Sequence, residues 1–190
     1  MFARFTTQAR DVLAEGLFVA RRYGHGHIGT EHLLLALAQP ASGPAAEVLR
    51  SAGLDPAALE AVVLAHAPRP GELSRTDAEA LIGLGIDADA LLATARDQIG
   101  ATLPAPPGKR GWLLSRERFR THRSFSAHAL RSLEHAVKEA KATRSAHIGT
   151  EHLLLGVLLT EDGLARTVLE EAGCDLDALR TSTRATLKAA

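Results

Sequence analysis

A nine-residue segment occurs twice in this chain. Residues 27–35 read HIGTEHLLL, and residues 147–155 read the same, 120 positions later. When this offset is kept without a gap, 22 of the 56 residue pairs between 5–60 and 125–180 are identical. Chance similarity between helices rich in Ala and Leu would not keep His, Gly, Thr and Glu in register. The sequence therefore predicts two copies of one structural unit.

Each copy reads as four helices. Ala and Leu dominate the chain and aromatic residues make up only 4%, a composition that favours packed helices over sheets. In the first copy, Thr6 or Thr7, Thr30 and Asp55 are predicted to cap helices, and Pro44 fits the first turn of another. The second copy repeats this scheme. We therefore expect an all-α fold of two four-helix repeats related by a pseudo-twofold axis.

The repeats divide the chain into three parts. Residues 1–65 form the first repeat and 123–190 the second, with an insert over 66–122. Part of the insert resembles the end of the first repeat, since 8 of 17 residues match between 45–61 and 77–93. Extra helices are therefore expected over about 77–99. A Pro-rich, basic linker over 104–122 follows, because its prolines prevent helix formation.

Charge and hydropathy limit the compartment and the partners. Lys plus Arg and Asp plus Glu both number 22, which argues against a surface devoted to nucleic acid. The single cysteine, Cys174, cannot form an internal disulfide. The apolar runs are far shorter than the ~20 residues of a membrane span, and no signal-peptide core follows Met1. We expect a cytoplasmic protein with no membrane partner.

The repeated Gly-Thr-Glu-His begins a helix, where backbone N–H groups and the helix dipole attract anions. Glu31 and Glu151 add a carboxylate suited to a guanidinium or ammonium group, next to Thr30 and Thr150. A ligand that carries both a phosphate and a cation would fit this pattern. The alternative is structural: the threonines cap their helices and the glutamates complement the dipole.

The histidines of the motif invite comparison with metal sites. His25, His27 and His32 lie close in sequence, but the second repeat has Ser145 opposite His25. Neither copy contains His-Glu-x-x-His, and no cysteine lies nearby. We expect these histidines to pack or form hydrogen bonds, with no metal and no cofactor bound.

Signatures of enzymes are missing from the sequence. It contains no phosphate-binding Gly-x-x-x-x-Gly-Lys-Ser/Thr loop and no Gly-x-Ser-x-Gly nucleophile motif. A hydrolase or transferase that used His32 or His152 would lack a partner motif. The other alternative is a nucleic-acid-associated regulator, because the basic insert contains Trp112 and Phe119. A solvated linker is favoured there, since the whole chain has no basic excess.

These motifs resemble a known family. Residues 1–6 (MFARFT), 27–35 and 53–55 (GLD) resemble the first N-terminal repeat of Clp ATPases, especially ClpC, and residues 147–155 resemble the second. The resemblance implies an eight-helix module that receives adaptors and substrates for an unfoldase–protease machine. The sequence contains no counterpart of the ATPase modules, and its insert resembles that of free-standing Clp-N proteins. We therefore expect no enzymatic activity.

The resemblance also implies specific site residues. In ClpC-type domains the glutamate of each Gly-Thr-Glu-His helps to bind phosphorylated arginine on substrate proteins, which points to Glu31 and Glu151 with Thr30 and Thr150. Some of these domains bind cyclic-peptide antibiotics on a face that includes the opening phenylalanine. The matching residues here are Phe2, Phe5 and Phe125, whereas Leu130 stands where the family has Lys. The expected function is a protein-binding adaptor or decoy of the Clp protease system, whose partners are substrate proteins, peptides or Clp components.

Overall fold

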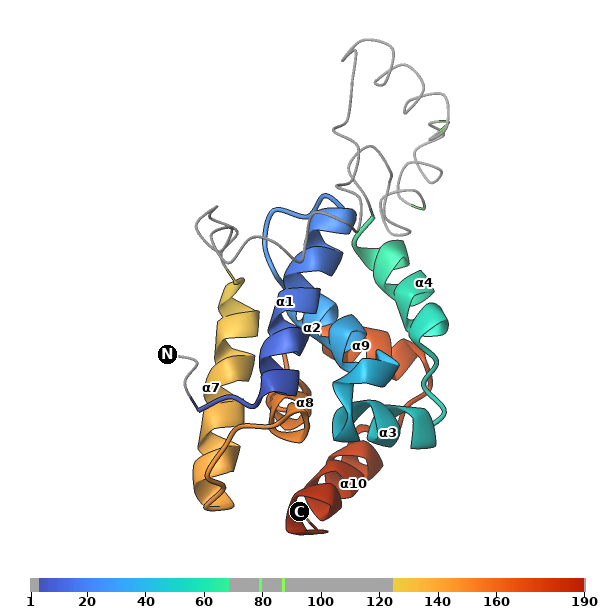
Figure 1. Cartoon of the computed structure of the whole chain (residues 1–190). Coiled ribbons are helices and arrows are strands. Elements are labelled where there is room, and N and C mark those ends of the chain that lie inside the picture. The colour runs from blue at the N-terminus through green and yellow to red at the C-terminus, as the bar shows by residue number, and fades with distance from the viewer. Residues whose placement is uncertain (1–3, 69–78, 80–86, 88–124, 190) are drawn as a thin grey trace.

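Helix starts recur at the repeat offset of 120 residues in the computed structural model, which describes residues 4–68, 79, 87 and 125–189. The first repeat contains α1 (Thr7–Arg22), α2 (Thr30–Leu37), the 3-10 turn η1 (Pro40–Ser42), α3 (Pro44–Ser51) and α4 (Pro56–His66). The second contains α7 (Ala127–Ala142), α8 (Thr150–Leu158), α9 (Leu164–Glu171) and α10 (Leu176–Ala189) (Figure 1). The all-α prediction is confirmed. The helices predicted over 77–99 and the linker over 104–122 lie outside the described residues, apart from Glu79 and Asp87.

Short-range signals set the starts of α1 and α4 and the end of α3 as predicted. The Thr6 hydroxyl accepts a hydrogen bond from the N–H of Ala9 at 3.1 Å and begins α1. The Asp55 carboxylate accepts from the first N–H groups of α4, and Pro56 occupies its first position. Gly53 follows α3 with a φ of 77°, a conformation that costs other residues energy. The Thr6 and Asp55 side chains thus pair backbone N–H groups that the start of a helix leaves without an acceptor.

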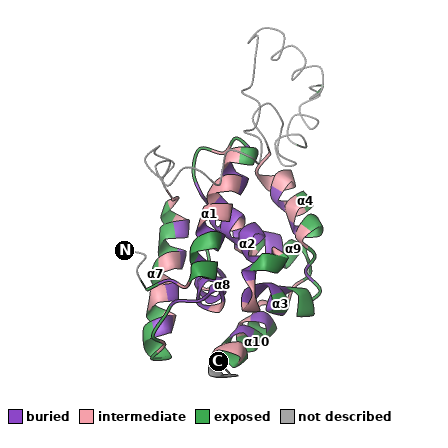
Figure 2. Ribbon diagram, viewed as in Figure 1, coloured by how far each residue is buried: buried purple, intermediate pink, exposed green. Residues whose placement is uncertain are grey.

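The hydrophobic core surrounds α2 and α8. Every residue of these two helices is buried except the glutamate near each start, and both helices are purple in Figure 2. Helix α7 packs very closely on α8, because a Cβ on Gly156 would overlap the carbonyl oxygen of Ser132. A glycine at this crossing lets the two backbones approach. Among the described residues, no helix combines the length and apolar character needed to cross a membrane.

The two repeats contact each other reciprocally. Phe5 forms an isolated β-bridge with Ile148, and Ile28 forms one with Phe125. Phe125 is the repeat equivalent of Phe5, and Ile148 is the repeat equivalent of Ile28. The two bridges are therefore the same contact with the repeats exchanged. Such an exchange is what a pseudo-twofold axis requires. The Ile28–Phe125 bridge fixes the loop before α2 against the start of α7, and the Phe5–Ile148 bridge does the same for the loop before α8 and the start of α1.

The threonines of the repeated motif join the repeats and do not cap their own helices. Gly29 and Gly149 are the N-caps of α2 and α8, so the predicted cap role of Thr30 and Thr150 is wrong. The Thr30 hydroxyl accepts from the N–H of Ala165 in α9 at 3.2 Å.

The equivalent hydroxyl of Thr150 accepts from the N–H of Ala45 in α3 at 3.4 Å. The N-cap residues of α3 and α9 are Gly43 and Gly163, which have no side chain to accept a hydrogen bond. A threonine of the opposite repeat supplies the missing acceptor.

Candidate binding sites at the starts of α2 and α8

A chain of hydrogen bonds fixes the histidine near the start of α2. The N–H of Gly29 donates to Nδ1 of His32 at 2.8 Å, so the proton of the neutral ring lies on Nε2. That Nε2–H donates to Nδ1 of His25, also at 2.8 Å. Nε2 of His25 then donates to the carbonyl of Pro68 at 3.2 Å. All four ring nitrogens therefore have partners, with both rings neutral.

Burial keeps the His32 ring neutral. Its side chain is 1% exposed, and burial together with the nearby His25 lowers its pKa to about 3. At neutral pH the imidazole is therefore an acceptor for the start of α2 and carries no charge. The sequence prediction that these histidines form hydrogen bonds agrees with this arrangement.

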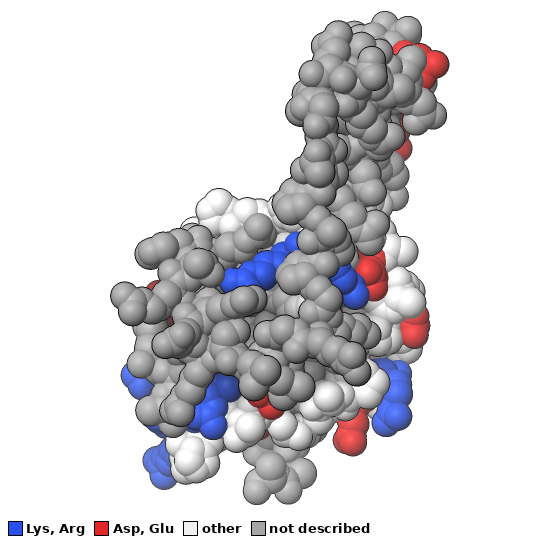
Figure 3. Space-filling model, turned by 45° about the horizontal axis from the view of Figure 1, so that its top comes forward, with Lys and Arg blue, Asp and Glu red and all other residues white. Residues whose placement is uncertain are grey.

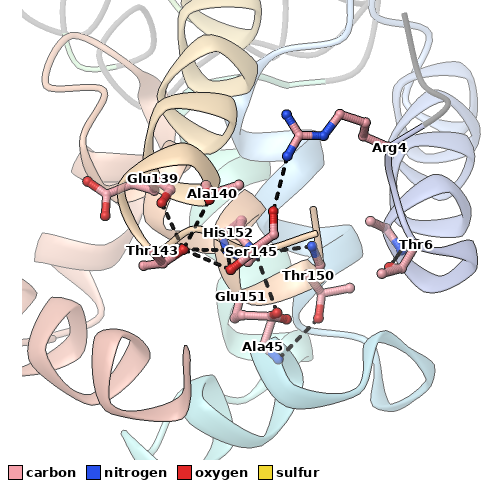
Figure 4. A network of polar contacts seen from close by, with 12 residues as sticks. Arg4, Thr6, Ala45, Glu139, Ala140, Thr143, Ser145, Thr150, Glu151 and His152 are labelled. Carbon is pink, nitrogen blue, oxygen red and sulfur yellow. Dashed lines mark hydrogen bonds and ion pairs between the residues drawn. The ribbon is translucent and has the colours of Figure 1, made fainter. Parts of the chain in front are cut away.

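The second repeat uses hydroxyl groups where the first uses an imidazole. The N–H of Gly149 donates to Nδ1 of His152 at 3.1 Å, as in the first repeat. Nε2 of His152 meets the hydroxyl of Ser145 at 3.2 Å and that of Thr143 at 3.4 Å (Figure 4). Ser145 thus replaces His25 as the partner of the buried ring. Figure 4 also shows Arg4 of the first repeat reaching the carbonyl of Ser145, at 3.0 Å.

The Glu31 carboxylate is folded back over the start of its own helix. A Cβ on Gly29 would overlap this carboxylate, so only glycine leaves room for it. The side chain is 12% exposed, and Oε1 lies 3.1 Å from Nδ1 of His32. Burial raises the pKa of Glu31, although a hydrogen bond to its own backbone opposes this effect.

Glu151 has the same placement but a different electrostatic setting. Its carboxylate lies over Gly149, and its side chain is 16% exposed. Burial acts to raise its pKa, but the neighbouring His152, its own backbone N–H and Thr150 outweigh burial and lower it. The two repeats thus hold equivalent carboxylates that differ in their affinity for a proton.

An open groove lies beside Glu31, with a volume of about 430 Å³. Its wall combines the loop before α2 and the end of α4 with Ser126 and His128 near the start of α7 and with Leu164 of α9. Among the described residues, four histidines line it: His25, His27, His32 and His128. The sequence did not predict that Ser126, His128 and Leu164 of the second repeat line this groove, because no local pattern links residues about 100 positions apart.

The remaining predicted site residues are found in different environments. The Thr30 and Thr150 side chains are buried and their hydroxyls are occupied between the repeats, so a ligand would meet only the backbone there. Phe5 is 5% exposed and belongs to the core, and Phe125 is partly buried against it. Phe2 lies outside the described residues. Leu130, in contrast, is 47% exposed on α7.

Comparison with known proteins identifies the family. The family model described as the Clp repeat (R) N-terminal domain matches residues 4–99 and 124–190, and the chain therefore belongs to this family. The chloroplastic chaperone protein ClpC2 of Arabidopsis thaliana is 32% identical over 181 residues, which are 95% of this chain and 14% of that protein. The ClpA homolog of Guillardia theta, an ATP-binding subunit of the ATP-dependent Clp protease, is also 32% identical over 181 residues. These are 95% of this chain and 17% of that protein. The chain thus spans less than a fifth of these relatives.

Solved structures show the same fold. The N-terminal domain of the Clp protease-associated chaperone ClpD from Arabidopsis thaliana matches with a TM-score of 0.61 at 20% identity, over 99% of this chain and 97% of that one. The N-terminal domain of Hsp104 from Candida albicans matches with a TM-score of 0.58 at 15% identity, over 94% and 88%. The all-helical fold of two repeats is therefore that of Clp N-terminal domains.

Proposed function

We propose that this chain is a non-enzymatic protein-binding module of the Clp protease system. It acts as an adaptor, or as a decoy that competes with Clp N-terminal domains, for substrate proteins or peptides marked by phosphorylated arginine. The single observation that supports the proposal most is the pair of carboxylates, Glu31 and Glu151, at equivalent helix starts of a chain that belongs to the Clp N-terminal family.

The chemistry of each helix start suits this ligand. A carboxylate pairs with a guanidinium through charge-assisted hydrogen bonds, and the first turn of a helix offers N–H groups and a positive dipole end to a phosphate. Glu31 borders an open groove, where a side chain of a bound protein can enter. At the second site, the exposed guanidinium of Arg4 beside Ser145 adds a positive charge for the phosphate.

The alternative of a nucleic-acid-associated regulator relies on the basic insert, which lies outside the described residues. On the face that Figure 3 shows, the described Lys and Arg side chains are scattered among Asp and Glu and give this alternative no support. Nucleic acid usually requires positive charge gathered on one face. We therefore retain protein binding as the proposed function.

Titration of free phosphoarginine by calorimetry tests the proposal. Each charged hydrogen bond contributes roughly 1.5–3 kcal/mol, so Glu31→Ala should weaken its site about tenfold to a hundredfold. Glu151→Ala should do the same at the other site, and the double variant should lose both. The free energy of unfolding should fall by no more than ~2 kcal/mol, the upper value for a partly buried charge near a helix N-terminus.

Glu47→Ala is the matched control. Glu47 also lies in the first turn of a helix, α3, but it is exposed and belongs to neither motif. This variant should bind phosphoarginine as the unaltered chain does. Equal heats for the unaltered chain and the double variant, or none for either at millimolar ligand, would contradict the proposal.

A further inference from the structure

We propose that His25 and His32 form the core of a site for a divalent transition-metal ion of the Zn²⁺ type, with Glu31 as the carboxylate that orients the inner ring. The ion would replace the proton that the two imidazoles now share. This site exists in the first repeat only, and it does not depend on phosphoarginine recognition.

The distances suit a metal ion. Nδ1 of His25 and Nε2 of His32 lie 2.8 Å apart, and ligand atoms of His25, Glu31 and His32 all lie within 4.8 Å of one another. Zn²⁺ holds imidazole nitrogens at about 2.0–2.1 Å in a tetrahedron, which places two such nitrogens roughly 3.3 Å apart. The two nitrogens therefore need to separate by about half an ångström. Because they now face each other in a hydrogen bond, the rings must also turn until both lone pairs point at the ion.

The outer ring is already oriented as a metal ligand. Histidine ligands usually donate their second ring N–H to a carbonyl or carboxylate, which fixes the tautomer. His25 donates from Nε2 to the carbonyl of Pro68, so its Nδ1 carries the lone pair. Both rings also line the groove of about 430 Å³, from which an ion and its remaining water ligands can approach.

The inner ring needs one proton to move. When Nε2 of His32 binds the ion, its proton transfers to Nδ1 of the same ring, so that the total number of protons is unchanged. Oε1 of Glu31, 3.1 Å from Nδ1, then accepts this N–H. The N–H of Gly29 now donates to Nδ1 and must turn away from the protonated nitrogen, and the Glu31 carboxylate already lies against this glycine. The result is the carboxylate–histidine–metal arrangement common in proteins.

The second repeat provides an internal comparison. Ser145 occupies the position of His25, and its hydroxyl meets Nε2 of His152 at 3.2 Å. A single imidazole with a neutral hydroxyl is a poor site for Zn²⁺, which prefers nitrogen, thiolate and carboxylate ligands. We therefore expect one ion per chain at the motif sites of the two described repeats.

Calorimetric titration of the untagged chain with ZnCl₂ tests the proposal. The expected result is one ion bound, with a dissociation constant in the micromolar range or below. His25→Ser should weaken binding by more than about 100-fold, because it removes a ligand and even loss of an outer partner costs about 10–100-fold. Glu31→Gln should weaken binding about 10–100-fold. His25→Ser should still fold, since serine serves as the partner of the buried histidine in the second repeat.

Two further variants complete the design. His147→Ser alters an exposed histidine of the second repeat and should leave Zn²⁺ binding unchanged. Ser145→His should create a second pair of imidazoles and raise the stoichiometry from one ion to two. The proposal is overturned if the unaltered chain binds no Zn²⁺ in the micromolar range. It is equally overturned if His25→Ser binds with the affinity and stoichiometry of the unaltered chain.

Discussion

At the scale of single residues, His32 is constrained by both burial and hydrogen bonding. It is fully buried, yet it must accept the N–H of Gly29 and donate to His25. Only the neutral ring can do both, because a protonated imidazole has no lone pair. The energy of burying a charge there lowers the pKa of His32 to about 3.

This low pKa predicts that acid destabilises the protein. In the unfolded chain a histidine titrates near 6.5, so between about 6.5 and about 3 the unfolded state binds a proton that the native state does not. The contribution of His32 to stability is therefore complete above pH 6.5 and is lost as pH falls towards 3. The loss approaches ~1.4 kcal/mol per pH unit. Urea unfolding measured at several pH values between 7.5 and 4.5 provides the test.

Substitution of His32 measures how much of the pH dependence of stability this ring contributes. His32→Asn keeps an acceptor for Gly29 but cannot be protonated, so the stability of this variant should depend less on pH. Burial raises the pKa of Glu31, and this shift stabilises the native state in acid, opposite to the effect of His32. The Glu31 contribution is the same in the His32→Asn variant and in the unaltered chain. His147→Asn, at an exposed position, should keep the original slope. Parallel slopes for His32→Asn and the unaltered chain would contradict the assignment.

At the scale of helices, the starts of α3 and α9 depend on residues from the opposite repeat. Both helices begin after a glycine that offers no side chain. Thr150 and Thr30 supply the acceptors, and both are buried between the repeats. A Cβ on Gly163 would lie 2.6 Å from the Thr30 hydroxyl, so glycine is required for this contact.

We expect Thr30→Val to destabilise the fold by about 1–3 kcal/mol, because it leaves the N–H of Ala165 buried without an acceptor. Thr150→Val should cost a similar amount at the N–H of Ala45. Valine keeps the shape of the side chain, so packing should change little. The free energy of unfolding, measured with urea, gives both values.

Thr181→Val serves as the control for the threonine variants. The Thr181 hydroxyl donates to the carbonyl of Asp177 on the exposed side of α10, so its loss should alter stability by less than about 0.5 kcal/mol. If Thr30→Val were no more destabilising than this control, the proposed role of threonine as a cap from the opposite repeat would be wrong.

At the scale of the whole molecule, the repeats are interlocked units of one fold. Phe5 and Ile28 of the first repeat pair with Ile148 and Phe125 of the second. Helices α2 and α8 lie together in the core, where each is covered by its own repeat and by the other (Figures 1 and 2). Separation of the repeats would expose these apolar surfaces to water.

A chain of residues 1–68 should therefore not fold by itself. It would lose the acceptor that Thr150 provides for α3 and would expose the apolar face of α2. A unit of this size also lacks the core that an isolated domain needs. Circular dichroism should show weak helicity and no cooperative thermal transition for the fragment, in contrast to the full chain. A cooperative transition in the fragment would contradict this expectation.

The sequence by itself determined the repeat, the helices of its two copies and part of their local caps. The two identical segments, the caps at Thr6 and Asp55 and the stop at Gly53 all act within a few residues, so they can be read along the chain. The sequence also located a carboxylate at each repeated helix start. The surroundings of those carboxylates could not be predicted in the same way.

Only the tertiary structure decided which partners these side chains meet. It places the Thr30 hydroxyl on α9, 135 residues away, although local reasoning assigned it to the start of α2. It also folds Glu31 over Gly29 and brings His25 onto His32 across a loop. The physical reason is that a local cap uses neighbours along the chain, whereas a buried polar group takes whichever partner the packing of the two repeats provides.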